Sequence, residues 1–254
     1  MKIVRFQDGA SAHWGIVEER MVRQIEGDPF GHFHLVSKTK RVEEVRLLSP
    51  CLPSKIVAVG VNYRDHAEEM KLGLPKEPLL FLKPSTSVIG PEEAIIYPTL
   101  ADRVDYEAEL AVVMRKVAKA VSEEKAAEHI LGYTCLNDVT ARDLQTKDGQ
   151  WTRAKGFDTF APMGPWIETE IDPSHLEISS YLNGERRQHS NTTQLIFGPL
   201  QLVSFISHIM TLLPGDVIAT GTPSGIGPMA IGDRIDVVIE GIGTLSNTIV
   251  ASEA

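Results

Sequence analysis

The sequence predicts an α+β protein that is rich in β-strands. Short apolar runs typical of strands outnumber the segments with helical spacing, and the two kinds do not alternate regularly. A doubly wound parallel sheet would need that alternation, so it is not expected. The dipeptide Asn183-Gly184 stands between two strand-like runs and is a strong signal for a β-hairpin.

The first 48 residues resemble short strands joined by turns. Residues 2–6 alternate polar and apolar, and Asp8-Gly9 marks a turn. Two prolines then indicate a linker at about residues 49–53. We therefore expect a small N-terminal β subdomain over residues 1–50 and a larger domain over residues 51–254.

The larger domain opens with Ile56–Val61, an apolar run short enough for a buried strand. Residues 62–70 look helical, with Asn62 as N-cap and Asp65 in the capping-box position. Further strands are expected at 79–82, 106–114, 133–136, 178–182, 217–220, 234–239 and 244–250. Further helices are expected at 122–130, 140–145 and 200–212.

Composition restricts the classes of function. The net charge of −9 at pH 7 argues against a nucleic-acid partner, because phosphate binding needs a basic surface. Two cysteines are too few for a disulfide framework. No stretch of about 18 apolar residues predicts a transmembrane helix, and the start lacks the apolar core of a signal peptide. We expect a cytoplasmic protein that does not use a membrane.

Glu107 and Glu109 are the most informative residues. Residues two apart in a strand share a face at a spacing of about 7 Å, and this face continues into Ala111 and Val113. Two such carboxylates repel one another unless a positive charge lies between them. A hard divalent cation with oxygen ligands would neutralise them. The alternative is a solvated strand end with two surface acids.

Asp138 strengthens the metal hypothesis because it follows the apolar strand expected at 133–136. Three carboxylates suit Mg²⁺ or Mn²⁺ and leave positions for water and a chelating substrate. Zinc is disfavoured, because the chain has no Cys/His cluster with zinc spacing. The alternative for Asp138 is an N-cap.

His66 and Glu69 lie three residues apart on a predicted helix, so their side chains face one another. A carboxylate beside an imidazole orients it and raises its basicity, as a general base requires. An exposed helix with no catalytic role has a similar composition. Lys155 is a candidate for holding a substrate anion. Weaker candidates for substrate contacts are Arg142, Gln145 and Thr222.

Six segments, in order, resemble the fumarylacetoacetate hydrolase family between about Lys55 and Val250. They are Gly-Val-Asn-Tyr-Arg-Asp-His at 60–66, Phe-Leu-Lys-Pro at 81–84, Asp-Tyr-Glu-Ala-Glu-Leu at 105–110, Asn-Asp-Val-Thr-Ala-Arg-Asp-Leu-Gln at 137–145, Lys-Gly-Phe-Asp at 155–158 and Gly-Thr-Pro-Ser-Gly at 221–225. Each one is a modest signal, whereas six in order are highly specific. The resemblance implies a mixed β-sandwich roll around the site, usually in a homodimer.

The resemblance also implies roles for single residues. The ligands of Mg²⁺ or Mn²⁺ would be Glu107, Glu109 and Asp138. The acid–base pair, on a lid that orders over bound substrate, would be His66 and Glu69. Lys155 and Gln145 would contact the reacting part of the substrate. Thr222 would bind the substrate's carboxylate. The further aspartate ligand of fumarylacetoacetase itself has no counterpart at 60–62, so the acylpyruvase, decarboxylase and isomerase branches fit better.

These residues suit a metal-stabilised enolate of a small 2-oxo acid. Water activated by His66 would break the C3–C4 bond of a β-diketo acid and release pyruvate. A carboxylate at C4, as in oxaloacetate, would leave as CO₂, and proton transfer alone gives tautomerisation or isomerisation.

We expect hydrolysis of an acylpyruvate-type substrate first. Decarboxylation of oxaloacetate and isomerisation of the 2-hydroxyhepta-2,4-diene-1,7-dioate type are the alternatives. A non-catalytic metal-binding relative is the alternative outside the enzymes, and the joint presence of His66, Glu69 and Lys155 argues against it.

Overall fold

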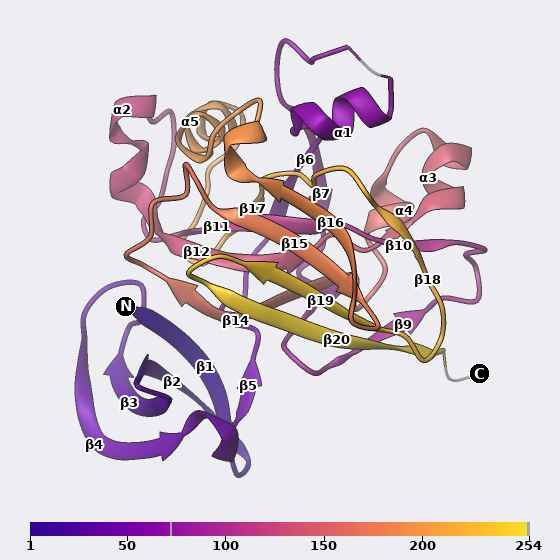
Figure 1. Cartoon of the computed structure of the whole chain (residues 1–254). Coiled ribbons are helices and arrows are strands. Elements are labelled where there is room, and N and C mark those ends of the chain that lie inside the picture. Colours follow the sequence, from indigo (N-terminus) through magenta and orange to yellow (C-terminus); the bar gives the residue numbers. More distant parts are fainter. Residues whose placement is uncertain (72, 253–254) are drawn as a thin grey trace.

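The computed structural model describes residues 1–71 and 73–252 and is rich in β-strands, with few helices (Figure 1). Among the described residues, the largest sheet has twelve strands. Ten of them follow the order β4 (Phe33–Arg41), β3 (Met21–Gly27), β2 (Ser11–Glu18), β1 (Lys2–Asp8), β14 (Ala161–Glu168), β12 (Ile130–Asn137), β11 (Ala108–Met114), β17 (Val217–Ala219), β6 (Ile56–Gly60) and β7 (Leu79–Lys83). The other two, which pair with β1 and β14, are β5 (Arg46–Leu48) and β8 (Val88–Ile89).

Two smaller sheets complete the β-structure of the described chain. The five-stranded sheet follows the order β16 (Glu185–Asn191), β15 (Glu177–Leu182), β19 (Arg234–Ile239), β20 (Gly243–Ala251) and β9 (Ala94–Tyr97). The three-stranded sheet follows the order β13 (Thr140–Ala141), β10 (Val104–Tyr106) and β18 (Gly227–Met229). The mixed, sheet-rich fold confirms the predicted class.

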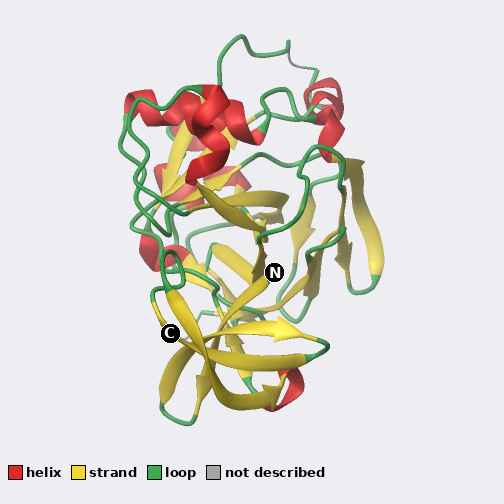
Figure 2. Cartoon of the chain, turned by 90° about the vertical axis from the view of Figure 1, so that its left-hand side faces the viewer, coloured by secondary structure: helices red, strands yellow, loops and turns green. Residues whose placement is uncertain are grey.

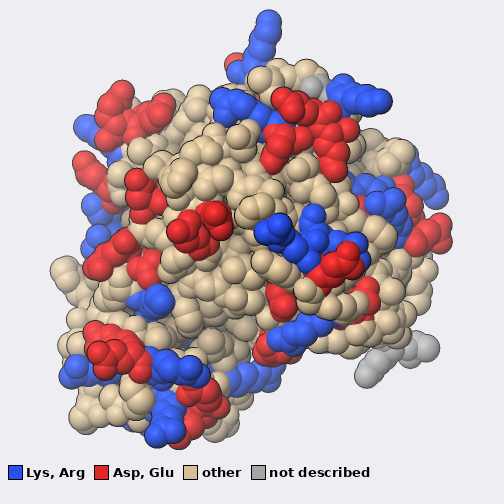
Figure 3. Space-filling view, viewed as in Figure 1, with Lys and Arg blue, Asp and Glu red and all other residues tan. Residues whose placement is uncertain are grey.

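The helices are short, and most lie at the end of the molecule away from the N-terminal strands (Figure 2). They are α1 (Arg64–Glu69), α2 (Glu123–Ala126), α3 (Arg142–Asp148), α4 (Thr152–Lys155) and α5 (Pro199–Ile209). No helix within residues 1–71 and 73–252 is long and apolar enough to span a membrane. On the face shown in Figure 3, acidic and basic side chains are interspersed.

Strand β11 is buried on both faces, and this places the candidate site in the core. Leu110 and Val112 pack in an apolar cluster with residues of β15, β19 and α5. Ala111 and Val113 pack in a second cluster with residues of β6 and β17. Because side chains alternate along a strand, Glu109 shares the face of Ala111 and Val113, as predicted.

The N-terminal strands extend the largest sheet. Strand β1 pairs antiparallel with β14 through Lys2↔Glu168 and Ile3↔Ile167. The chain's amino group lies 2.8 Å from Glu168 Oε1, next to that pairing. Strands β1 to β4 form the lobe at the lower left of Figure 1. The division into domains at residue 50 stays a prediction.

Asn62 does not cap a helix, and that prediction was wrong. Helix α1 begins at Arg64, and its N-cap residue, Tyr63, makes no side-chain cap hydrogen bond. The buried Asn62 side chain instead accepts the Phe197 N–H at 2.9 Å. It also donates to the carbonyls of Phe197 at 3.0 Å and Thr220 at 2.7 Å. These partners lie far along the chain, so local sequence could not reveal them.

Candidate active site

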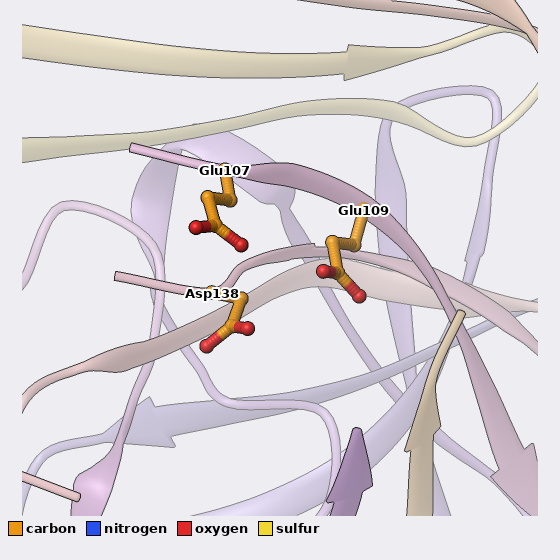
Figure 4. Close-up of side chains that lie close together, drawn as sticks. All are labelled: Glu107, Glu109 and Asp138. Atoms are coloured by element: carbon orange, nitrogen blue, oxygen red, sulfur yellow. The ribbon is translucent and has the colours of Figure 1, made fainter. Parts of the chain in front are cut away.

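Glu107, Glu109 and Asp138 lie together in the core with exposed fractions of 6%, 1% and 0%. One carboxylate oxygen from each lies within 4.8 Å of the others. Figure 4 shows the three side chains around a common space. Glu107 lies between β10 and β11, Glu109 lies in β11, and Asp138 directly follows β12.

The pairing of β11 with β12 explains this placement. Ala108 is the register partner of Asn137, so the residues on either side of this pair lie next to one another. The Asn137 side-chain oxygen accepts the backbone N–H of Glu107 at 2.9 Å. The Asp138 N–H donates to the Glu107 carbonyl at 2.9 Å. Hydrogen bonds of their backbones therefore fix Glu107 and Asp138 where the adjacent strands β11 and β12 meet.

Three cations neutralise two of these carboxylates. Lys155, the last residue of α4, donates from Nζ to Glu107 Oε2 at 2.9 Å and to Asp138 Oδ2 at 2.6 Å. Lys83, the last residue of β7, donates to Asp138 Oδ1 at 2.5 Å. Arg142 donates to Glu107 Oε1 at 2.5 Å. Each oxygen of Glu107 and of Asp138 therefore contacts a positive charge.

Glu109 differs from its two neighbours. Its Oε2 accepts the backbone N–H of Gly221 at 2.8 Å, and no salt bridge to Glu109 occurs among the described residues. Burial raises the pKa of Glu109 well above its usual value, and the charges of Asp138 and Glu107 raise it further. Burial also raises the pKa of Glu107, but Lys155 and Arg142 outweigh it and lower that pKa to about 2.

This donor set fits a hard divalent cation. Such cations take oxygen ligands, and three carboxylates match that preference. Glu109 is the one carboxylate of the three that forms no salt bridge with a lysine or arginine of the described chain. A cation bound here would relieve the repulsion that raises the pKa of Glu109.

His66 and Glu69 face one another on α1. The distance from His66 Nδ1 to Glu69 Oε2 is 3.2 Å. The Glu69 carboxylate also accepts the backbone N–H of Gly225 at 3.2 and 3.3 Å. His66 is buried, whereas the Glu69 side chain is partly exposed. The predicted pair is therefore formed, and a second chain segment holds its carboxylate.

A cavity of about 130 Å³ lies between the carboxylates and α1. Eight of the nine predicted site residues line it, and they are His66, Glu107, Glu109, Asp138, Arg142, Gln145, Lys155 and Thr222. Glu69 reaches the cavity only through His66. The cavity therefore brings the predicted acid–base pair, the three candidate metal ligands and a buried lysine together in one place.

Comparison with known proteins identifies the family. A family model described as "Fumarylacetoacetate (FAA) hydrolase C-terminal" matches residues 55–250. The chain belongs to the fumarylacetoacetate hydrolase family. A second model, described as "Rv2993c-like, N-terminal", matches residues 1–50.

Similar members of the fumarylacetoacetate hydrolase family bear several activities in their names. Rat (Rattus norvegicus) oxaloacetate tautomerase Fahd2a, mitochondrial, is 40% identical over 82% of this chain and 70% of the rat protein. The structure of a 2-hydroxyhepta-2,4-diene-1,7-dioate isomerase from Mycobacterium marinum is 43% identical, with a TM-score of 0.93 over the whole of both chains. Maleylpyruvate hydrolase from Sphingobium sp. SYK-6, solved with manganese(II) and pyruvate, is 30% identical, with a TM-score of 0.83 over the whole of both chains.

Arg142, a predicted substrate contact, is bound by three protein side chains. In this member of the fumarylacetoacetate hydrolase family, its Nε donates to Asp105 at 2.9 Å and its Nη1 donates to Gln145 at 2.6 Å. Its Nη2 donates to Glu107. The guanidinium is thus engaged on three sides by protein groups, and it holds Glu107 in place.

Lys83 is one residue of the site that sequence reasoning missed. It belongs to one of the segments that resemble the fumarylacetoacetate hydrolase family, yet we assigned it no role. Its Nζ contacts Asp138 and also donates to the Val139 carbonyl at 3.1 Å. The available signal was a lysine directly after the apolar run 79–82, because a buried lysine needs a partner.

Proposed function

We propose that this chain is a Mg²⁺- or Mn²⁺-dependent enzyme that transfers protons at the carbon next to the keto group of a small 2-oxo acid. The observation that carries the proposal is the cavity itself, where the Glu107, Glu109 and Asp138 carboxylates share one small space with His66. Ligand sites for drug-sized molecules span roughly 300–1,000 Å³, so the cavity of about 130 Å³ favours a small substrate.

A divalent cation would be held by Glu107, Glu109 and Asp138. When bound, it would supply Lewis-acid stabilisation of negative charge on the 2-oxo oxygen. The related maleylpyruvate hydrolase, which was solved with manganese(II) and pyruvate, supports both the metal and the class of ligand.

The chain's own residues supply the proton transfer. His66 removes a proton from the substrate carbon or returns one, and Glu69 orients its imidazole through Nδ1. Lys155 contacts the reacting part of the substrate together with Gln145. Thr222, whose hydroxyl donates to the Ala108 carbonyl at 2.9 Å in this structure, would turn that hydroxyl to bind the substrate carboxylate. The buried setting of Lys155 strengthens its interaction with a negative charge.

Tautomerisation or double-bond isomerisation is the reaction that the cavity supports best. Both need only a proton-transfer pair and charge stabilisation, and both occur in the names of relatives at 40% and 43% identity. Hydrolysis of the C–C bond of an acylpyruvate is the second candidate. The maleylpyruvate hydrolase at 30% identity favours it, with His66 activating water for attack on the C4 carbonyl.

The test uses chelator-treated protein with oxaloacetate and acetylpyruvate, with and without Mn²⁺ or Mg²⁺. Ketonisation of enol-oxaloacetate is followed by its absorbance, and pyruvate release is followed by NMR. We expect metal-dependent turnover that Glu109→Gln abolishes.

Glu128→Gln, which changes an exposed acid, is the matched control and should turn over normally. Turnover that survives metal removal, or full activity of Glu109→Gln, would contradict the proposal. Faster release of pyruvate from acetylpyruvate than ketonisation of enol-oxaloacetate would favour the hydrolase.

A further inference from the structure

One wall of the cavity is apolar, and Trp151 forms part of it. Trp151 occupies the N-cap position of α4, beyond the end of α3. Its indole ring meets the Phe81 ring edge-on, with 5.1 Å between ring centroids and an interplanar angle of 71°. Met70 and Val61 also line the cavity.

The indole rests directly against the backbone at Gly60. A Cβ at residue 60 would lie 2.7 and 2.8 Å from two carbon atoms of the Trp151 ring, closer than real Cβ contacts. Gly60 is therefore the residue type that lets the indole come this near. The contact closes the space between the end of β6 and the start of α4.

Trp151 is also connected to the polar side of the cavity. The Lys155 backbone N–H donates to the Trp151 carbonyl at 3.0 Å, within the single turn of α4. The Lys155 ammonium lies 5.0 Å from the centroid of the Phe81 ring. Trp151, Phe81 and Lys155 therefore keep a fixed spacing, so the apolar wall stands at a set distance from the carboxylates.

We propose that Trp151 is a specificity-determining residue that limits the length of the 2-oxo acid. This inference rests on the proposed function. With the substrate's carboxylate and 2-oxo oxygen at the polar side, the carbons beyond C3 turn toward Gly60, Phe81 and Trp151. The indole ends the cavity there, so a short chain fits and a long one meets its ring.

The experiment measures binding, so it does not depend on turnover. N-methyl oxamate and N-hexyl oxamate carry the chelating carboxylate and carbonyl of a 2-oxo acid on chains of different length. Their affinities for Mn²⁺-loaded protein are measured by calorimetry for wild type, Trp151→Ala and Trp151→Phe. Trp14→Phe, in the N-terminal strand β2, is the control.

We expect wild type and Trp14→Phe to prefer N-methyl oxamate by about tenfold or more, the scale of added methylenes in a pocket. Trp151→Ala should remove or reverse that preference, and Trp151→Phe should lie between. If both Trp151 variants bind N-methyl oxamate normally and keep the wild-type ratio of affinities for the two oxamates, the role of Trp151 is overturned. The proposed function would not be affected by that result. Failure of wild type to bind either oxamate would overturn the proposed function, and this inference with it.

Discussion

Lys83 Nζ lies 2.5 Å from Asp138 Oδ1, and both side chains are completely buried. Burial lowers the pKa of Lys83, although Asp138 opposes that shift. The pair joins the last residue of β7, at one edge of the largest sheet, to the residue after β12. One carboxylate of the candidate metal site is thus anchored across four strand-to-strand steps of the sheet.

Replacing Lys83 with methionine should destabilise the protein by about 3 kcal/mol, because breaking a buried ion pair leaves a buried charge short of a partner. Urea unfolding of the metal-free protein measures this. Lys38→Met, which removes a half-exposed partner of Asp8, should lower stability far less, because an ion pair between exposed groups contributes little. Equal stabilities of the two variants would mean that the Lys83 pair contributes little.

Asp216 should make stability depend on pH in the acid range. Burial raises the pKa of Asp216, but hydrogen bonds from Lys55 and Ser54 outweigh it and lower the pKa below its usual 3.8. A carboxyl whose pKa is lower in the folded state than in the unfolded state stabilises the protein when the pH is above the unfolded-state pKa. This stabilisation is lost as the pH falls through the folded-state pKa. Urea unfolding should therefore show wild type and Asp216→Asn converging below about pH 4. A constant difference down to about pH 3 would contradict this.

His66→Ala should slow ketonisation of enol-oxaloacetate by about 10² or more, the usual scale for loss of a general acid–base. Affinity for Mn²⁺, measured by calorimetry, should stay unchanged, because His66 lies outside the carboxylate cluster. Decarboxylation of oxaloacetate breaks a C–C bond without a proton being moved to or from carbon in that step, so it should be affected less. His208→Ala, an exposed histidine on α5, is the control. Equal losses in both reactions would argue against this division of roles.

The chain should form a homodimer, as its family resemblance implies. Strand β7 lies at an edge of the largest sheet, and its Leu79 and Leu82 are 50% and 47% exposed. Exposed apolar residues on an edge strand invite association. Light scattering after gel filtration should give twice the mass of one chain, and a monomer at micromolar concentration would refute the prediction.

Local sequence patterns predicted the strands and turns that their own residues favour. The strand expected at 234–239 is β19, residue for residue. The hairpin at Asn183-Gly184 joins β15 to β16, with positive φ angles of 52° and 81° that suit this dipeptide. Such features depend on neighbouring residues, so the sequence displays them directly.

Strand β14 was not predicted, although it lies between β1 and β12 in the largest sheet. Its Pro162, Gly164 and Pro165 are the residue types that mark turns. What makes the segment a strand is pairing with distant residues, including Lys2 and Leu136. No local pattern records those partners.

The same distinction applies to the site. The three carboxylates could be predicted because each stands near the end of an apolar strand. Lys83 and Arg142 could not be given their roles, because their partners Asp138 and Asp105 are 55 and 37 residues away. The sequence thus indicated the candidate metal ligands more readily than the groups that hold them.

The Asn62 side chain links three segments of the chain near the site. Its hydrogen bonds connect the segment that leads into α1 with Phe197 and with Thr220, so three segments that are distant in sequence are held together at one side chain. These hydrogen bonds hold the backbone two residues before α1 begins at Arg64. A lid movement that carried His66 away from the carboxylates would therefore begin after Asn62, within the residues that lead into the helix.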